Sequence, residues 1–170
     1  MKEQIAAELE SAFSLYGFAQ PSVAKLNKAC SVSLRTLYKY FPSKEAMIIG
    51  ALEHRHRRYL QHLMCDLASE PREALSQIFD RLESWMETEA PNGCMSTNAL
   101  TDFPDNPEIK QVVSEHKQQV RAYLANLSGC EQLGGAIFLI HEGASNAWPL
   151  VGKTTIDIAK FTVNQLIKEK

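Results

Sequence analysis

The side chains best suited to chemistry gather in residues 22–47, where cationic and hydroxyl groups alternate with apolar ones. Arg35, Lys39 and Lys44 carry positive charge, and neighbouring serine, threonine and tyrosine residues supply hydroxyl groups. Such groups hydrogen-bond to phosphate oxygens and base edges and do not by themselves break covalent bonds. Elsewhere the sequence has no Ser/His/Asp order, nucleophile elbow or metal-ligand spacing, so we expect no enzyme activity, metal or cofactor.

The net charge of −2 conceals an uneven distribution along the chain. Residues 25–58 hold eight basic and two acidic residues, a local charge of +6, whereas residues 1–24 sum to −2 and residues 59–170 to −6. A local cationic surface on an otherwise acidic protein suits phosphate binding. An ordinary solvated charged face is the alternative for such a cluster alone, but its coincidence with a helix-turn-helix pattern favours phosphate binding.

Short helices must position these side chains. Apolar residues at helical spacing predict helices over residues 23–29 and 34–40, joined by a tight turn, which is a helix-turn-helix pattern. Ser33 is placed to cap the second of these helices and Ser43 to cap a third. Pro42 prevents the second helix from continuing. The pair is therefore expected to present one short, firmly bounded helix.

The run from Cys30 to Ala46, CSVSLRTLYKYFPSKEA, resembles the signature of TetR-type transcriptional regulators, A-G-V-S-x-G-T-[LIV]-Y-x-[HY]-F-x-S-K-E-x-L. Four positions depart from that signature: Cys30, Ser31, Arg35 and Met47. Ser31 replaces the glycine of the turn, which implies a less favourable turn because a non-glycine residue with positive φ is strained. The resemblance covers this first part of the chain closely and the remainder loosely.

The resemblance implies that the helix beginning after Ser33 lies in the major groove of double-stranded DNA. Its first turns would then face base edges with Leu34, Arg35 and Lys39, and Arg35 could reach guanine in a bidentate contact. Other matching positions contact phosphates in the family. Tyr38 could instead pack the small core. The predicted DNA-binding residues are Ser22, Ser33, Leu34, Arg35, Thr36, Tyr38, Lys39, Tyr40 and Lys44.

Helical periodicity continues to the end of the chain, which predicts an all-α protein. We expect an N-terminal three-helix helix-turn-helix DNA-binding domain over residues 1–46. A C-terminal helical bundle for effector binding and dimerisation is expected over residues 47–170. The sequence has no apolar run of about 18 or more residues and no signal-peptide pattern. Its four widely spaced cysteines, without a C-x-x-C pair, fit reduced thiols in a cytoplasmic protein.

A long helix is expected from Ser43 to about Leu67 and would act as a lever out of the DNA-binding domain. Its middle, Glu53–Arg58, contains two histidines and three arginines. His54 and His56 lie two residues apart and therefore on different helical faces, which is poor geometry for chelating a metal. We interpret this segment as a solvated basic face.

Two polar residues lie where the helical pattern expects apolar ones: Asn98, near the inner side of a short helix over residues 94–102, and His116 in the next helix. The run from Asn92 to Ala99 resembles the G-C-x-x-x-N-A segment of TetR-type effector domains. A cavity with a few polar groups among apolar walls is the usual form of a small-molecule site. Plain core, with both polar groups satisfied by the backbone, is the alternative. The predicted effector-binding residues are Phe79, Trp85, Met86, Met95, Asn98, His116 and Tyr123.

The last two predicted helices, at about 131–148 and 154–168, carry apolar stripes. Glycines such as Gly134 and Gly143 would let another helix approach closely. In the resembled family two such helices pack against their symmetry mates as a four-helix bundle, which implies a homodimer. Within one chain the same stripes could be intramolecular core. They consist of Leu133, Ala136, Ile137, Ile140, Ala144 and Ala147, followed by Ile156, Ala159, Val163, Leu166 and Ile167.

The resemblance implies a transcriptional regulator, most often a repressor, whose homodimer binds a palindromic operator and is released by a small-molecule effector. The alternative is a helical small-molecule-binding protein whose helix-turn-helix no longer binds DNA, since Ser31 and Arg35 occupy family glycine positions. A nucleotide-binding enzyme is rejected. Gly152–Thr155 resembles the end of a phosphate-binding loop, but that motif requires glycine at the position of Ala147.

Overall fold

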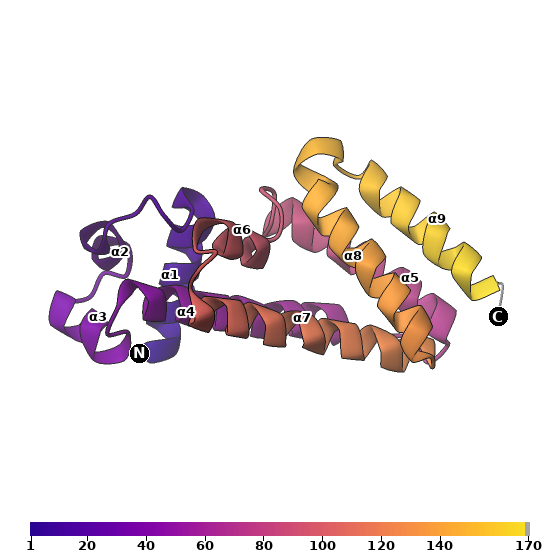
Figure 1. Ribbon diagram of the computed structural model, residues 1–170, viewed down its shortest axis with the longest axis horizontal. Helices are drawn as coiled ribbons and strands as arrows, with labels where there is room; N and C mark the ends of the chain where they lie inside the picture. Colours follow the sequence, from indigo (N-terminus) through magenta and orange to yellow (C-terminus); the bar gives the residue numbers. More distant parts are fainter. Residues whose placement is uncertain (169–170) are drawn as a thin grey trace. The chain divides into compact units, whose positions relative to one another are not determined.

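The computed structural model describes residues 1–168 of the chain, and over that range it contains helices and loops but no strand (Figure 1). The predicted all-α fold class is therefore confirmed. No helix in the described range is both long enough and apolar enough to span a membrane. The helices are α1 (Lys2–Tyr16), α2 (Val23–Ala29), α3 (Leu34–Tyr40), α4 (Lys44–Met64), α5 (Pro71–Thr88), α6 (Met95–Asp102), α7 (Pro107–Ser128), α8 (Glu131–Val151) and α9 (Thr154–Lys168).

The chain divides into two compact units that are each discontinuous in sequence. The head unit consists of residues 1–58 and 95–115, and the body unit consists of residues 59–94 and the chain from His116 onward. Helices α4 and α7 each contribute to both units, whereas α6 belongs wholly to the head unit. The domain boundary after residue 46 stays a prediction, because compactness alone does not delimit a DNA-binding domain.

The core of the head unit is built by apolar residues from six helices. Helix α1 buries one face, and the rings of Phe13 and Phe18 stack with their centroids 5.0 Å apart. Leu37 of α3 is fully buried, and burial of such a side chain stabilises a fold by about 1.5–3 kcal/mol. The contribution of α6 and α7 to this core comes from Met95, Ala99, Ile109 and Val113.

Side-chain caps fix where the short helices of the head unit begin. Ser33 Oγ accepts a hydrogen bond from the backbone N–H of Thr36 at 3.1 Å, and Ser43 Oγ accepts one from Ala46 at 3.0 Å. Both caps confirm the sequence prediction. Ser31 has a φ of 52°, so the turn before α3 holds the strained conformation expected from the loss of glycine.

A loop contact explains why α6 belongs to the head unit. Asp102, at the end of α6, accepts hydrogen bonds through Oδ2 from the backbone N–H groups of Phe18 at 3.3 Å and Ala19 at 3.2 Å. These two residues lie between α1 and α2. A carboxylate that receives two backbone N–H groups fixes the loop before the helix-turn-helix pair.

The body unit packs α5 against both α8 and α9, which run antiparallel side by side (Figure 1). Gly134 permits the close approach of α8 to α7, since a Cβ there would lie 2.2 Å from the Cα of Ala125. Ile137 and Ile156, from the predicted stripes, are fully buried within the chain. Those stripes therefore serve mainly as intramolecular core. A different set of apolar side chains on α8 and α9 is at least half exposed: Leu139, Leu150, Val151, Ile158 and Phe161.

Candidate nucleic-acid interface

One face of α3 consists of exposed side chains that can bind nucleic acid. Leu34 is 48% exposed and Tyr38 is 41% exposed, although both are large apolar or aromatic residues. Arg35 and Lys39 are also exposed, and neither forms an ion pair with any residue in the range that the structure describes. We call these four residues the α3 face. It combines two available cations with two surfaces suited to apolar contact with bases.

Hydroxyl groups lie at the N-terminal ends of both helices of the helix-turn-helix pair. Ser22 is exposed and caps α2 by accepting a hydrogen bond from the N–H of Lys25 at 3.3 Å. Ser33 is exposed, and its hydroxyl lies 2.8 Å from the hydroxyl of half-buried Thr36. The Lys25 ammonium lies 3.3 Å from the centroid of the Tyr16 ring. Hydroxyl groups and amides at helix N-termini are common phosphate ligands, so this arrangement suits backbone contacts to DNA.

Two of the predicted phosphate-binding residues already have intramolecular contacts. Lys44 donates a hydrogen bond from Nζ to the carbonyl of Ala19 at 2.9 Å. Tyr40 is half-buried and packs against the head core, with the Lys39 ammonium 5.5 Å from its ring centroid. Their assignment as phosphate ligands stays a prediction.

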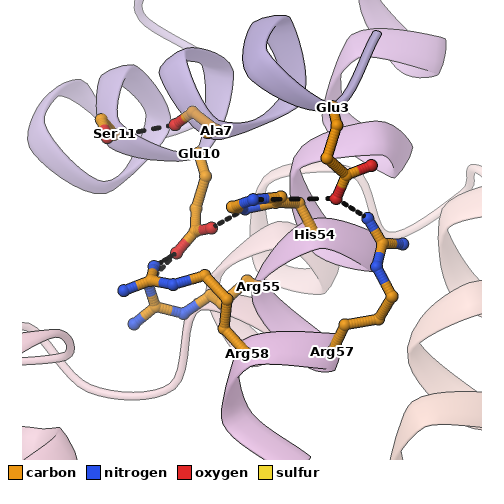
Figure 2. A network of polar contacts seen from close by, with 8 residues as sticks. All are labelled: Glu3, Ala7, Glu10, Ser11, His54, Arg55, Arg57 and Arg58. Carbon is orange, nitrogen blue, oxygen red and sulfur yellow. Dashed lines mark hydrogen bonds and ion pairs between the residues drawn. The ribbon is translucent and has the colours of Figure 1, made fainter. Parts of the chain in front are cut away.

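The basic segment of α4 differs from its predicted form. Glu10 of α1 is only 3% exposed and is contacted by two arginines and one histidine, which Figure 2 shows converging on its carboxylate. Arg55 and Arg58 donate to Glu10 Oε1 at 3.1 and 2.7 Å, and His54 Nδ1 lies 2.5 Å from Oε2. Arg57 pairs with Glu3. The interpretation of Glu53–Arg58 as a solvated basic face is therefore wrong, because acidic residues of α1 neutralise most of its charge.

The ion pairs between α4 and α1 reduce the number of cations that are available within the local charge of +6. Three of the eight basic residues behind that count, all of them arginines of α4, are engaged by Glu3 and Glu10. The cationic surface of the head unit is consequently concentrated on α2, α3 and the start of α4. A signal for the pairing existed in the sequence, since Glu3 and Glu10 lie seven residues apart and thus on one side of a helix.

The predicted effector-binding residues do not all join one unit. Phe79, Trp85 and Met86 lie in the core of the body unit, where His116 is also buried and Tyr123 is half-buried. Met95 lies in the core of the head unit. Asn98 is exposed, so the expectation that it lies near the inner side of its helix is wrong. Burial raises the pKa of the Tyr123 hydroxyl above its ordinary value.

A chain of polar side chains in the body unit was missed by sequence reasoning. Lys117 donates to Glu142 at 2.6 Å and to the sulfur of Cys94 at 3.2 Å. Glu142 also meets Nδ1 of His141 at 3.2 Å, and the other ring nitrogen of His141 contacts the Tyr59 hydroxyl. The adjacent His141-Glu142 pair inside the mostly apolar helix α8 was an available signal for buried polar chemistry.

Metal chemistry gains no support from the arrangement of ligands. Within residues 1–168, no group of three or more histidine, cysteine, aspartate or glutamate side chains is arranged to hold a metal ion. His54 is engaged by Glu10. The exposed cations and hydroxyls of α2 and α3 are therefore the site that best fits a binding function.

Comparisons with known proteins agree with this geometry. Residues 5–51 match the family model described as "Bacterial regulatory proteins, tetR family". A search of curated proteins gave no significant match. The matched segment spans α1, α2, α3 and the beginning of α4, so it includes every residue of the α3 face.

Solved structures with the same fold cover nearly the whole chain. A TetR-family transcriptional regulator from Streptomyces coelicolor has a TM-score of 0.85 at 16% identity, covering 98% of this chain and 95% of its own. A TetR transcriptional regulator from Chloroflexus aurantiacus has a TM-score of 0.82 at 19% identity, with coverages of 99% and 94%. A TetR transcription regulator from Haloarcula marismortui has a TM-score of 0.81 at 15% identity, with coverages of 99% and 96%.

At these identities the likeness of the whole chain concerns its fold, whereas the family model identifies the first part by sequence. Residues 5–51 thus match the tetR family of bacterial regulatory proteins by sequence, within a chain that has the fold of TetR-type transcriptional regulators.

Proposed function

We propose that this protein is a transcriptional regulator of the TetR type that represses genes by binding a palindromic operator as a homodimer. The observation that carries the proposal is the α3 face, in which Leu34, Arg35, Tyr38 and Lys39 are exposed on a helix bounded by capping residues. Arg35 suits a bidentate contact to guanine, and Leu34 suits contact with a thymine methyl group. Neighbouring hydroxyls and amides would hold the phosphates.

Dimerisation would use the exposed apolar residues of α8 and α9. Leu150 is 89% exposed and Phe161 is 64% exposed, which is unusual for large apolar side chains unless another surface covers them. Gly143 adds open space on α8, since a Cβ there would meet nothing within 4 Å. Self-association through one shared surface gives a two-fold symmetric dimer, and such symmetry matches a palindromic operator.

Release from the operator would follow binding of a small molecule to the effector region. The proposal assigns this contact to the predicted residues that lie in the body unit: Phe79, Trp85, Met86, His116 and Tyr123. Among them, buried aromatic and sulfur-containing side chains accompany His116, a composition typical of ligand sites. A ligand that binds the non-DNA-binding state more tightly shifts the population toward that state.

The DNA-binding proposal can be tested by selecting bound duplexes from genomic fragments and measuring affinity for a recovered duplex. Arg35→Ala should weaken binding by about 1–3 kcal/mol, or roughly fivefold to more than a hundredfold, and relax specificity at one base pair. Arg72→Ala is the matched control, because Arg72 is an exposed arginine in the body unit. Equal affinities of the wild type and Arg35→Ala would contradict the assigned interface. Failure to recover any duplex would favour a small-molecule-binding protein instead.

The assigned phosphate contacts have their own test. Lys44→Ala and Tyr40→Phe should each weaken operator binding with little change in sequence preference, because phosphate contacts position the protein without reading bases. Lys44→Ala should also reduce the salt dependence of binding. Unchanged affinity and salt dependence in both variants would remove these two residues from the interface.

Dimerisation is tested by the pair of substitutions Ile158→Glu and Phe161→Glu. Together they should convert the protein to a monomer in analytical ultracentrifugation, because two buried carboxylates without partners oppose association. Leu15→Glu is the control, since Leu15 is 71% exposed on α1 and lies outside the proposed surface. A double variant that stays dimeric would contradict this assignment.

A further inference from the structure

We propose that Cys94 is a modification site whose sulfur reacts with α,β-unsaturated carbonyl compounds, with Lys117 as the neighbouring cation that promotes the reaction. Cys94 is half-buried, so it is partly accessible to a small reagent. The Nζ of Lys117 lies 3.2 Å from its Sγ. A thiolate beside a cation and partly open to solvent is the usual setting of a reactive cysteine.

Lys117 is held in place by further side chains of the body unit. Its Nζ lies 2.6 Å from Oε2 of Glu142, whose other oxygen lies 3.2 Å from Nδ1 of His141. His141 is only 2% exposed and also contacts the Tyr59 hydroxyl. The ammonium is thus anchored on one side by a carboxylate while it points toward the sulfur, so the short Lys117–Cys94 distance does not depend on a free surface lysine.

The charge of Lys117 persists at neutral pH. Burial by itself lowers the pKa of this lysine, but the attraction of Cys94 and Glu142 outweighs burial and holds the pKa above its ordinary value. The pKa of Glu142 is correspondingly held below its ordinary value despite burial, through His141 and Lys117. A permanent cation next to the sulfur favours the thiolate over the thiol.

The other cysteines provide internal controls with different surroundings. Cys65 is exposed, but a hydrogen bond to the Asp66 carboxylate and the charge of that carboxylate raise the pKa of its thiol. Cys30 is buried, and burial raises the pKa of its thiol to about 11. If exposure alone set the reaction rate, Cys65 would react faster than Cys94. If the neighbouring charges set the rate, Cys94 would react faster than Cys65, and the proposal requires this second result.

The reaction is a conjugate addition that needs no oxidant. The thiolate sulfur of Cys94 forms a bond to the β carbon, and the π electrons of the carbon–carbon double bond move toward the carbonyl oxygen. The Lys117 ammonium can donate a hydrogen bond to the developing enolate. The proton that the thiol released to water returns to the α carbon, and the product is a thioether.

An adduct on Cys94 would lie at the start of α6. Cys94 directly precedes Met95, the first residue of α6, and the last residue of α6, Asp102, holds the loop before α2. We expect the adduct to displace the start of α6 and to weaken operator binding. This consequence rests on the proposed function, whereas the reactivity of Cys94 does not.

The reactivity is tested with acrylamide as the probe, using mass spectrometry of peptides to follow each cysteine separately. At pH 7, Cys94 in the wild-type protein should react about tenfold faster than Cys65, which corresponds to about one pKa unit of difference in thiolate population. Lys117→Met should slow Cys94 about tenfold and move its rate profile to higher pH. Lys117→Arg keeps the cation and should restore most of the rate.

Faster reaction of Cys65 than of Cys94 in the wild type would overturn the proposal. This comparison uses only the wild-type protein, so it does not depend on whether a variant folds. An unchanged Cys94 rate in Lys117→Met would overturn the role of Lys117. For the consequence on DNA, alkylated wild type should bind the operator about tenfold more weakly than alkylated Cys94→Ser. Equal binding would overturn the regulatory consequence. Absence of DNA binding before alkylation would contradict the proposed function and leave the reactivity result intact.

Discussion

Two groups of cations in the head unit lie close in sequence but have opposite surroundings. Arg35 and Lys39 on α3 are exposed, whereas Arg55 and Arg58 on α4 converge on the buried carboxylate of Glu10 (Figure 2). The first group is available to an external anion, and the second joins α4 to α1. The comparison shows that the density of basic residues locates a binding surface only after internal acidic partners have been identified.

The two groups of cations differ in their hydration: the α4 arginines have lost water around Glu10, whereas the α3 cations remain hydrated. Glu10 and Arg55 are both buried, so their mutual attraction compensates for desolvation, and removal of one leaves a buried charge without its partner. The cations of the α3 face keep their water until an external phosphate or base replaces it, and counterions are released at that moment. The four predictions that follow address this contrast.

The largest effect is expected from Glu10→Ala. The substitution should lower the free energy of unfolding by about 3–5 kcal/mol, because it strands buried Arg55. Urea denaturation followed by circular dichroism measures the change. Glu8→Ala is the control, since Glu8 is an exposed glutamate of the same helix and should change stability by less than about 0.5 kcal/mol. A loss at Glu10 no larger than the loss at Glu8 would contradict the structural role of the α4 arginines.

Lys39→Ala tests the other side of the comparison. It should reduce the slope of log affinity against log salt by about one, because one fewer cation displaces counterions from the DNA. Arg57→Ala should leave the slope nearly unchanged, because Arg57 is an exposed cation that already pairs with Glu3. Titrations of labelled duplex at several salt concentrations give both slopes. Equal slope changes in the two variants would mean that pairing does not separate the groups.

Ser31→Gly sharpens the comparison without changing any charge. The φ of 52° at Ser31 is costly for a residue with a Cβ, so glycine should stabilise the fold by up to about 1 kcal/mol. The gain is limited because glycine also increases the entropy of the unfolded chain. Thermal unfolding measures the change. Ser14→Gly is the control, because this exposed position inside α1 should instead be destabilised by glycine.

The smallest effect concerns Glu3 and Arg57. The hydrogen bond and charge of Arg57 hold the pKa of the Glu3 carboxyl below its ordinary value. Because the folded-state pKa is lowered, the pair stabilises the fold above the unfolded pKa and loses this effect as pH falls through the folded one. Arg57→Ala should move the Glu3 pKa back up in a carboxyl NMR titration. A Glu3 pKa that does not change in this variant would show that the pair is not formed in solution.

Sequence patterns predicted the local features of this fold well. The helices of the helix-turn-helix pair, the caps at Ser33 and Ser43 and the strained turn at Ser31 all follow from interactions within a few residues. The all-α class follows from periodicity that persists along the chain. Such information is contained in short windows of sequence.

Features that depend on distant partners could not be read in the same way. The partner of Arg55 is 45 residues away, and the apolar stripes on α8 and α9 gave no sign of which face would be covered by α5. Asn98 was expected near the inner side of its helix because it occupies a position where the helical pattern expects an apolar residue, yet it is exposed. Sequence periodicity separates apolar from polar faces, but it does not say which element covers each face.

Because the head unit is discontinuous in sequence, truncating the chain after the helix-turn-helix pair removes part of the core of that unit. Met95, Ala99, Ile109 and Val113 complete the core around α1 and α4, although they follow the helix-turn-helix pair by more than 50 residues. A fragment that stops after Arg58 would leave an apolar surface bare and would lose the carboxylate of Asp102. Expression of such a fragment should give an aggregation-prone product, because part of the hydrophobic core around the helix-turn-helix pair comes from a later stretch of the polypeptide.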